Sequence, residues 1–509
     1  MNLAEALVGD AACRRFGDAE ALRHGDRSFT RGELGALVNR TGNALRSLGA
    51  GPGDKVVLVM RDSPELVAAF LGALKGGAVA VPLSTRITVR DLAHVVTDCA
   101  ARLVVADGRY RELCSDALAK AGTGCRLVVA DGDGKDDLSA TADASSEVMA
   151  AEPRDAADEA FWLYSSGTTG TPKGIVHTHK DIAPLASLQR DVLELAPGDL
   201  VYCTSKLSFA YSLAYALIAP LQIGARTLLD DEWSSPERAV HLIERHRPRA
   251  VFSTPSLYRA MVHSLDDRAW RALADVRYFV SAGEHVPPAL ARQWRERTGN
   301  GILDGIGTSE TVSLICCAPT REGRDGSIGF PLPGVELRIL DDDGADVETG
   351  DTGHLWVRHP FLFDRYANLA EETAERFRDG WLMTGDLFRR DQDGFCYHRG
   401  RRDDRLKVAG QWVALQEVEE AARADPSVVD SAAVAVEDRD GMRRIALFVV
   451  PAKDTDGAAL VGGVRERLAR DLPLHKNPRW VRAVAEFPRT STGKVRKFLL
   501  GKLISDPTE

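Results

Sequence analysis

The sequence predicts an α/β protein: a large N-terminal domain of layered α/β subdomains with a small β-rich subdomain, followed by a small, mobile α+β C-terminal domain. Short apolar runs of strand length alternate with segments of helical spacing, a pattern typical of mostly parallel sheets covered by helices. After residue 334 the alternation changes to strands joined by turns. Charge density then peaks at residues 399–407, where we expect a linker, so the predicted domains are residues 1–402 and 403–509.

Each element of the N-terminal domain is predicted from its local pattern. Apolar runs of strand length occur at residues 55–60, 78–82, 103–106, 127–130, 250–253 and 276–280. Apolar residues at helical spacing predict helices at residues 64–75 and 91–100 and from Pro255 onward. We expect loops at residues 131–137 and 141–158.

The C-terminal part of the chain is predicted to contain strands before helices. Residues 335–358 are expected to form strands joined by turns, and residues 389–400 a hairpin around Asp393 and Gly394. Beyond the linker, the pattern predicts helices at residues 415–424 and 460–472 and strands at residues 432–436 and 446–450. This pattern of helices and strands in the last block predicts a compact α+β domain.

Composition and charge exclude several classes of protein. With 509 residues, 44% of them apolar, the chain can form a large core, which excludes a disordered protein. A formal charge of −9 is unsuited to binding nucleic acid through its phosphates. The eight cysteines show no CxxC spacing and the N-terminus resembles no secretory signal, so we expect a cytoplasmic protein.

One uncharged segment has nearly the length of a membrane span. It covers residues 207–225, LSFAYSLAYALIAPLQIGA. Because serine, proline and glutamine interrupt it and alanine is abundant, we expect a buried helix of a soluble core and no membrane partner. The sequence leaves the oligomeric state open.

The motif YSSGTTGTPKG at residues 164–174 carries most of the chemical information. It follows an apolar strand and precedes residues 175–182, IVHTHKDI, which are expected to open a helix. Its hydroxyl side chains alternate with glycines, so that hydroxyls and backbone N–H groups can surround phosphate oxygens, and Lys173 adds a positive charge. The spacing differs from that of the Walker loop. The motif predicts phosphate binding, with a flexible surface loop as the alternative.

Five further motifs follow in order, and together they resemble the adenylate-forming superfamily of acyl- and aryl-CoA ligases, adenylation domains and luciferases. They are SAGEHV (281–286), DGIGTSE (304–310), TGDL (384–387), GRRDDRLKVAGQWVALQEVE (400–419) and RTSTGKVRK (489–497). The resemblance covers nearly the whole chain. Ile306 replaces the usual aromatic residue and Trp412 a common arginine. These departures, together with the sequence segments FWLYSSGTTG, HTH and DGIG, resemble the benzoate-CoA ligase branch.

The resemblance implies an ATP site. Thr168, Thr169 and Lys173 would hold the β- and γ-phosphates, and the catalytic Glu310 would bind Mg²⁺. Asp386 would accept hydrogen bonds from both ribose hydroxyls, with Arg401 reaching the ribose or phosphate region. The other residues implied at the nucleotide are Ser165, Ser166, Gly283, Glu284, Asp304, Ile306, Thr308 and Ser309.

The resemblance also implies a mobile catalytic lysine. Lys494 would bridge the substrate carboxylate and the α-phosphate during adenylation. The second half-reaction needs a thiol at the same carbonyl carbon, so the C-terminal domain would rotate about Asp403 and withdraw the lysine. Gly410 would then line the tunnel for the pantetheine arm.

By the same resemblance, the acyl pocket lies between the uncharged segment and the Gly307 loop. Its expected lining is Phe209, Ala210, Tyr211, Gly283, Gly307 and Leu314. Ser208, Ser212 and Ser313 can take a ring hydroxyl or amino group, although each of these side chains can equally belong to the core. His177 and His179 have no third ligand, so we expect them to support the site or to start a helix.

The predicted function is ATP-dependent activation of a carboxylic acid, with a benzoate-like aromatic acid favoured, followed by thioester formation with CoA. The required cofactors are ATP, Mg²⁺ and CoA, or the phosphopantetheine of a separate acyl carrier protein if the enzyme is a stand-alone adenylation enzyme. A non-catalytic nucleotide-binding regulator is a third hypothesis, although all charged residues expected for adenylation are present.

Overall fold

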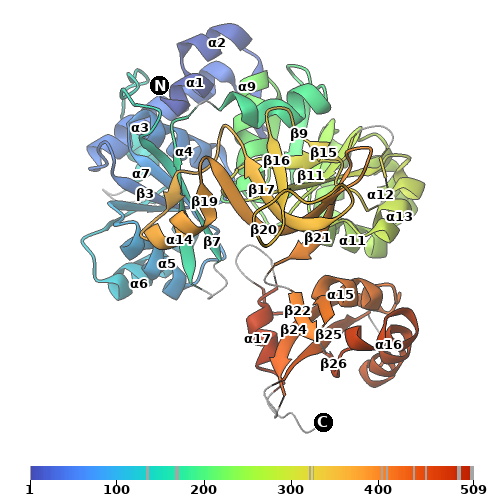
Figure 1. Cartoon of the computed structure of the whole chain (residues 1–509). Coiled ribbons are helices and arrows are strands. Elements are labelled where there is room, and N and C mark those ends of the chain that lie inside the picture. Colours follow the sequence, from blue (N-terminus) through green and yellow to red (C-terminus); the bar gives the residue numbers. More distant parts are fainter. Residues whose placement is uncertain are drawn as a thin grey trace. The chain divides into compact units, whose positions relative to one another are not determined.

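The computed structural model describes residues 2–132, 137–166, 171–180, 182–319, 323–324, 326–402, 405–408, 411–438, 442–452, 455–489 and 495–504. These residues form two compact units (Figure 1). The first comprises Met1–Leu337 with Val357–Leu382, and the second Arg338–Trp356 with Met383–Glu509.

A seven-stranded sheet forms one part of the first unit. Its strands, in spatial order, are β18 (Arg365–Tyr366), β8 (Pro172–Thr178), β7 (Glu159–Ser166), β4 (Val79–Pro82), β3 (Lys55–Val59), β5 (Leu103–Ala106) and β6 (Arg126–Val129). The strands from β4 to β6 pair in parallel, as the alternation with helices predicts. The helices α5 (Val89–Asp98) and α6 (Arg111–Ala121) pack on one face through Leu92, Val96 and Cys114.

A nine-stranded sheet forms the other part of this unit. Its order is β15 (Phe330–Pro331), β14 (Leu314–Cys317), β13 (Ile302–Gly307), β12 (Tyr278–Ser281), β11 (Ala250–Ser253), β9 (Leu200–Cys203), β10 (Arg226–Leu229), β1 (Glu20–His24) and β2 (Arg27–Thr30). An aromatic core that includes Tyr258, Trp270, Phe279 and Trp294 joins it to α10 (Pro236–His246), α11 (Pro255–Ser264), α12 (Asp267–Ala274) and α13 (Pro288–Thr298).

The first unit also contains the helices α1 (Leu3–Val8), α2 (Asp10–Phe16), α3 (Arg31–Ser47), α4 (Pro64–Lys75), α7 (Leu138–Asp143) and α14 (Ala370–Arg376). Helix α7 extends into the region expected to be a loop, because the Asp137 side chain caps it by accepting a hydrogen bond from Ala140 N.

The uncharged segment is a buried helical run, as expected. It comprises α8 (Ala210–Leu213), the π-helical turn η4 (Ala214–Ile218) and α9 (Ala219–Ile223). The buried Arg31 closes its C-terminal end, since its guanidinium donates to Leu221 O at 2.7 Å. In the described part of the chain no helix combines the length and the hydropathy that crossing a membrane requires.

One expectation is wrong. Residues 175–182 were expected to open a helix, but residues 175–178 belong to β8, which pairs antiparallel with β7 from Gly174 opposite Tyr164 to Thr178 opposite Glu159. The β-branched Ile175 and Val176 are fully buried in this hairpin. Pairing with two neighbouring strands, β7 and β18, outweighs the local helical interpretation.

Most residues of the predicted β-rich elements belong to the second unit, although residues 377–378 fall within the range of the first. A five-stranded sheet has the order β16 (Glu336–Leu340), β17 (Thr352–Arg358), β20 (Trp381–Arg390) and β19 (Phe377–Arg378), with β21 (Cys396–Arg401) also paired to β20. The hairpin between β20 and β21 turns at Asp393 and Gly394, as predicted, and Gly394 has a φ of 87°.

The C-terminal block of this unit is α+β, as predicted. It contains the pair β22 (Arg405–Val408) and β23 (Gln411–Ala414), and a sheet of β24 (Val428–Glu437), β25 (Arg443–Pro451) and β26 (Trp480–Ala483). The helices α15 (Leu415–Arg423) and α16 (Gly457–Asp471) pack on that sheet, and α17 (Lys497–Gly501) lies near the end. All eight cysteines are free thiols.

Candidate functional site

An acidic loop, residues 308–313, joins β13 to β14 and carries Glu310. The two strands approach each other so closely that a side chain is excluded at Gly307. A Cβ there would lie 2.4 Å from Ser313 O, whereas at Gly305 the nearest atom is the end of the Leu314 side chain, Cδ1. Gly307 of DGIG therefore makes the hairpin possible.

The acidic loop contains backbone strain at Val312. This buried, β-branched residue has a φ of 62°, and across it Ser313 N donates to Thr311 O at 2.7 Å. That combination defines the γ-turn with positive φ, which is rare and strained. The Thr311 hydroxyl braces the turn, since it lies 3.1 Å from Thr308 O and 2.8 Å from Ser313 O. Such strain persists only where the surroundings hold it in place.

Glu310 is held by its side chain and by its backbone. Its Oε1 accepts a 2.6 Å hydrogen bond from the Tyr366 hydroxyl, and its carbonyl accepts one of 2.7 Å from Phe363 N. Burial, with Glu310 adding to it, raises the pKa of the Tyr366 phenol, which therefore stays protonated and donates. The carboxylate is only partly buried and presents hard oxygens suited to a divalent cation bound to phosphates.

Lys173 lies on the same tyrosine. Its Nζ is 3.7 Å from the centroid of the Tyr366 ring and 2.6 Å from Glu372 Oε1. The structure thus brings the predicted phosphate lysine and the predicted metal ligand to one side chain, with the cation over the ring face and the carboxylate at the hydroxyl. Tyr366 and Glu372 contact predicted site residues, and the sequence reasoning missed both because no motif contains them.

Several of the residues implied at the nucleotide lie on β13 or just beyond the carboxyl ends of β12 and β13, the usual ligand-binding edge of a parallel sheet. The buried Asp304 accepts from His285 Nδ1 at 2.8 Å and from Val286 N at 3.1 Å, which joins the SAGEHV and DGIGTSE motifs. Glu284 accepts from the Ser256 hydroxyl at 2.9 Å. Gly283 is exposed, while Ile306, Thr308 and Ser309 are partly buried.

The expected acyl segment packs against the same sheet. The Tyr211 hydroxyl donates to Val280 O at 3.1 Å, and its ring lies edge-on to Phe252 with centroids 6.0 Å apart. The Tyr215 hydroxyl accepts from Leu314 N at 2.9 Å. Tyr211 and Leu314, both expected to line the pocket, are therefore placed in one cluster with Ala210, which is also buried.

Ser208, Ser212 and Ser313, which were considered as partners for a polar ring substituent, differ in the contacts of their hydroxyls. Ser212 Oγ already donates to Ser205 O at 2.9 Å. Ser313 lies beside the Tyr215 phenol. Ser208 Oγ and Ser313 Oγ are both buried and have no hydrogen-bond partner among the described residues, so these two hydroxyls are better suited to a ligand than that of Ser212.

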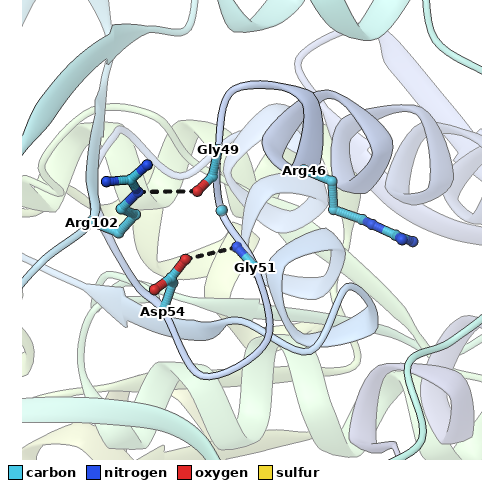
Figure 2. A pocket seen from close by; sticks show the side chains of 6 residues that line it. Arg46, Gly49, Gly51, Asp54 and Arg102 are labelled. Atoms are coloured by element: carbon cyan, nitrogen blue, oxygen red, sulfur yellow. Dashed lines mark hydrogen bonds between the residues drawn. The ribbon is translucent and has the colours of Figure 1, made fainter.

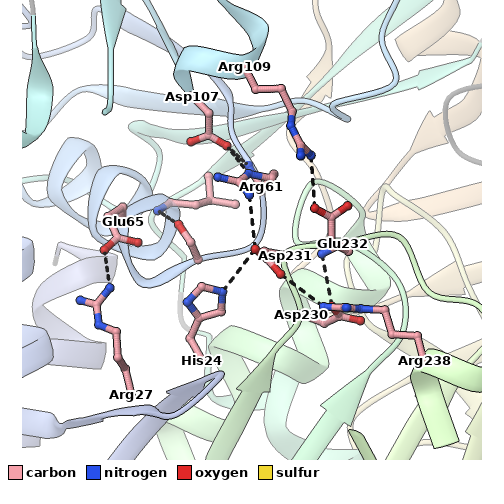
Figure 3. A network of polar contacts seen from close by, with 12 residues as sticks. His24, Arg27, Arg61, Glu65, Asp107, Arg109, Asp230, Asp231, Glu232 and Arg238 are labelled. Atoms are coloured by element: carbon pink, nitrogen blue, oxygen red, sulfur yellow. Dashed lines mark hydrogen bonds and ion pairs between the residues drawn. The ribbon is translucent and has the colours of Figure 1, made fainter. Parts of the chain in front are cut away.

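The sequence reasoning also missed the anchor of the acyl segment. The carboxylate of Asp62, which follows β3, accepts a hydrogen bond from Leu207 N, with both oxygens at 3.1 Å. Burial raises the pKa of Asp62 to about 7. A polar network lies nearby, in which Arg61 contacts Asp107 and Asp231 (Figure 3). An aspartate just after a buried strand was the only signal for this anchor.

Within the second unit, Asp386 and Arg401 lie side by side. They are register partners in β20 and β21, and Arg401 Nε is 3.9 Å from Asp386 Oδ1. His398 Nε2 is 3.2 Å from the same oxygen. Asp386 is buried, so its orientation is set by these neighbours.

Several predicted residues lie outside the described residues. They are Thr168, Thr169, Asp403, Gly410 and Lys494, together with the side chains of Ser166 and Trp412. The expectations for them stay predictions. Ser165 is described, at the end of β7 opposite Lys173.

A surface depression of about 420 Å³ lies beyond the C-terminal end of α3 (Figure 2). Its lining includes Arg46, Gly49, Asp54 and Arg102, none of which belongs to the predicted site. Arg102 Nε donates to Gly49 O at 3.2 Å. The depression therefore lies where Asp54 and Arg102 bind the backbone that follows α3.

Comparison with known proteins agrees with this arrangement. Residues 9–367 match the family model "AMP-binding enzyme", and residues 417–494 match "AMP-binding enzyme C-terminal domain". The chain is 39% identical to a 3-hydroxybenzoate–CoA ligase of Aromatoleum sp. (strain CIB), over 99% of this chain and 97% of that protein. It is 37% identical to a benzoate–CoA ligase of Thauera aromatica, over 98% and 95%.

A solved structure shows the same architecture. The anthranilate CoA ligase AuaEII, crystallised with anthranoyl-AMP, superposes with a TM-score of 0.91 at 30% identity, covering 99% of this chain and 97% of that chain.

Proposed function

The chain belongs to the AMP-binding enzyme family, and we propose that it activates an aromatic carboxylic acid with ATP and transfers the acyl group to the thiol of CoA. The observation that carries the proposal is its similarity, over nearly the full length, to two ligases that join benzoate or 3-hydroxybenzoate to CoA. The Glu310–Tyr366–Lys173 group supports it, because adenylation concentrates negative charge that cations and donors must stabilise.

In the first half-reaction an oxygen of the substrate carboxylate attacks the α-phosphorus of ATP, and the bond to pyrophosphate breaks. Lys173 is placed to hold the leaving phosphates once it exchanges Glu372 for a phosphate oxygen. Glu310 would hold Mg²⁺, which supplies positive charge to the phosphate oxygens. Lys494 is proposed as the cation that bridges the carboxylate and the α-phosphate.

Nucleotide orientation is assigned to residues at the strand ends and to β20. Asp304 holds the SAGEHV segment that we place beside adenine, and Ile306 offers it an aliphatic contact. Asp386, with Arg401 beside it, is proposed to bind the ribose hydroxyls.

An aromatic acid fits the character of the acyl segment. Tyr211 belongs to a cluster of edge-on aromatic rings, and Phe209 lies against Trp233 with centroids 6.4 Å apart. Residues 207–225 contain no lysine or arginine to pair with a second carboxylate. We therefore place the ring near Ala210, Tyr211, Gly307 and Leu314.

In the second half-reaction the thiol sulfur of CoA attacks the acyl carbon, its proton is lost, and AMP leaves. We propose that residues 403–509 move about Asp403 for this step, and that Gly410 lines the thiol tunnel. Free thiols throughout the chain suit a reducing cytoplasm, which we propose as its location. The phosphopantetheine of a separate carrier protein is the alternative acceptor.

Acid-dependent ATP–pyrophosphate exchange with a panel of benzoates and aliphatic acids tests the proposal. We expect exchange with benzoate or a ring-substituted benzoate and little with aliphatic acids. Thioester formation is then measured with CoA and with a carrier protein in parallel. Exchange with no acid in the panel would refute the activity, and transfer to the carrier protein alone would refute CoA as the acceptor.

A further inference from the structure

His177 lies within β8 and is fully buried. Its Nε2 is 2.9 Å from Ser309 O, the carbonyl immediately before Glu310. A carbonyl only accepts, so Nε2 carries the hydrogen of this bond. Burial lowers the pKa of His177 to about 3, and the ring is therefore neutral, with its other nitrogen, Nδ1, buried and unpartnered among the described residues.

Two phenylalanines fix the orientation of this imidazole. Phe161 of β7 stacks on it with centroids 4.8 Å apart and an interplanar angle of 19°. Phe361 lies nearly parallel to it, at 6.0 Å and 2°. The two phenylalanine rings are themselves only 6.4 Å apart, so the three rings form one packed cluster. Within this cluster the imidazole cannot turn Nε2 away from Ser309 without disturbing a packed core.

The bond to Ser309 completes a set of attachments from neighbouring elements. Strand β8 pairs with β18, placing Tyr366 opposite Ile175, two residues from His177. Tyr366 binds the Glu310 carboxylate, and Phe363 N binds the Glu310 carbonyl. The strained turn at Val312 follows directly, so the loop needs external attachments to keep its shape.

We propose that His177 is a positioning residue, whose Nε2–H holds the Ser309 carbonyl so that the acidic loop presents Glu310 to the metal-bound phosphates of ATP. This inference rests on the proposed function for its consequence in catalysis. The hydrogen bond from His177 Nε2 to Ser309 O, which we call the clamp, is a property of the folded chain without ligands.

His179 provides a matched control. It is as fully buried as His177 and lies just beyond β8, and burial lowers its pKa to about 4. Its Nδ1 accepts a hydrogen bond from Leu3 N at 3.1 Å, so it holds the start of α1, far from the acidic loop in sequence. Loss of a buried neutral histidine is common to both positions, whereas loss of the Ser309 bond is specific to His177.

The experiment compares His177→Phe, which keeps an aromatic ring and removes the donor, with His177→Gln, which restores an N–H at a similar reach. Hydrogen exchange of a peptide covering residues 306–316 is measured in the ligand-free, magnesium-free protein. The Mg²⁺ concentration giving half-maximal pyrophosphate exchange is measured separately.

For His177→Phe we expect loop exchange and the Mg²⁺ requirement each to rise about five- to tenfold, the equivalent of one lost hydrogen bond. His177→Gln should restore both to within about twofold, and His179→Gln should change neither. Unchanged loop exchange in His177→Phe, or equal impairment in His177→Gln, would overturn the proposal.

If His177→Phe does not fold, Phe361→Leu removes one ring of this aromatic cluster and keeps the imidazole. Faster exchange of the same loop amides would support the clamp, and unchanged exchange would overturn it. If the wild-type protein catalyses no pyrophosphate exchange with any acid, the proposed function fails, while the loop exchange still decides the clamp.

Discussion

The hydroxyl of Tyr366 lies 2.6 Å from Oε1 of Glu310, 56 positions earlier in the chain. This bond connects β18 to the acidic loop. Because the face of the same ring carries Lys173, one tyrosine sets the position of an anionic and a cationic group that the proposed adenylation uses together.

Replacing Tyr366 with phenylalanine should separate these two roles. The ring that contacts Lys173 remains and only the bond to Glu310 is lost, so we expect the KM for MgATP in the exchange assay to rise about three- to tenfold. Thermal unfolding should show only a small loss of stability. An unchanged KM would show that the bond does not hold Glu310 in its working position.

Glu372→Gln should strengthen ATP binding. The ion pair with Lys173 is partly exposed, and the lysine must exchange it for phosphate. Removing the competing charge should lower the dissociation constant of ATP about two- to fivefold, the scale of a surface ion pair. The neighbouring exposed Glu371, changed to glutamine, is the control for net charge. Weaker binding in Glu372→Gln would mean that Glu372 orients Lys173 for ATP.

Asp62→Asn should alter the pH dependence of stability. Burial raises the pKa of Asp62 from its ordinary value of 3.8 to about 7, with Lys206 opposing the shift. Between these values the folded protein retains a proton that the unfolded chain releases. This contribution to stability is full below the lower pKa and is lost as pH rises through the higher one, with a slope of up to about 1.4 kcal/mol per pH unit.

We expect urea unfolding at a series of pH values to show this slope in the wild type and a shallower one in Asp62→Asn. Identical slopes would place the ionisation of Asp62 outside the folding equilibrium. Acid binding provides an independent test of Asp62. Because Asp62 accepts a hydrogen bond from Leu207 N at the start of the acyl segment, Asp62→Ala should also weaken binding of the acid.

Lys494→Ala should block adenylation and spare thioester formation. Loss of a cation at the α-phosphate is expected to reduce pyrophosphate exchange at least about a hundredfold. Transfer from a preformed acyl-adenylate to CoA should remain close to wild type, because the lysine has withdrawn by then. The exposed Lys502, changed to alanine, is the control on the same domain. An equal fall in both half-reactions would contradict domain alternation.

Much of the architecture could be predicted because the signals are local. Apolar runs such as residues 55–60 and 103–106 indicate strands by their own composition, and Gly307 of DGIG marks a close approach of backbones. Residues 175–178 show the limit of such signals, since the pairing of β8 with β7 and β18 decided their conformation.

The sequence by itself determined the α/β alternation, the motif predicted to bind phosphate and the position of Glu310 in a turn that follows a glycine. Only the tertiary structure decided which side chains hold that turn. Tyr366 and His177 reach the loop from 56 and 132 residues away, and Asp62 reaches Leu207 from 145. Hydrophobic periodicity indicates the local conformation that each segment prefers, whereas a hydrogen bond between distant segments exists only after the sheets and helices have packed.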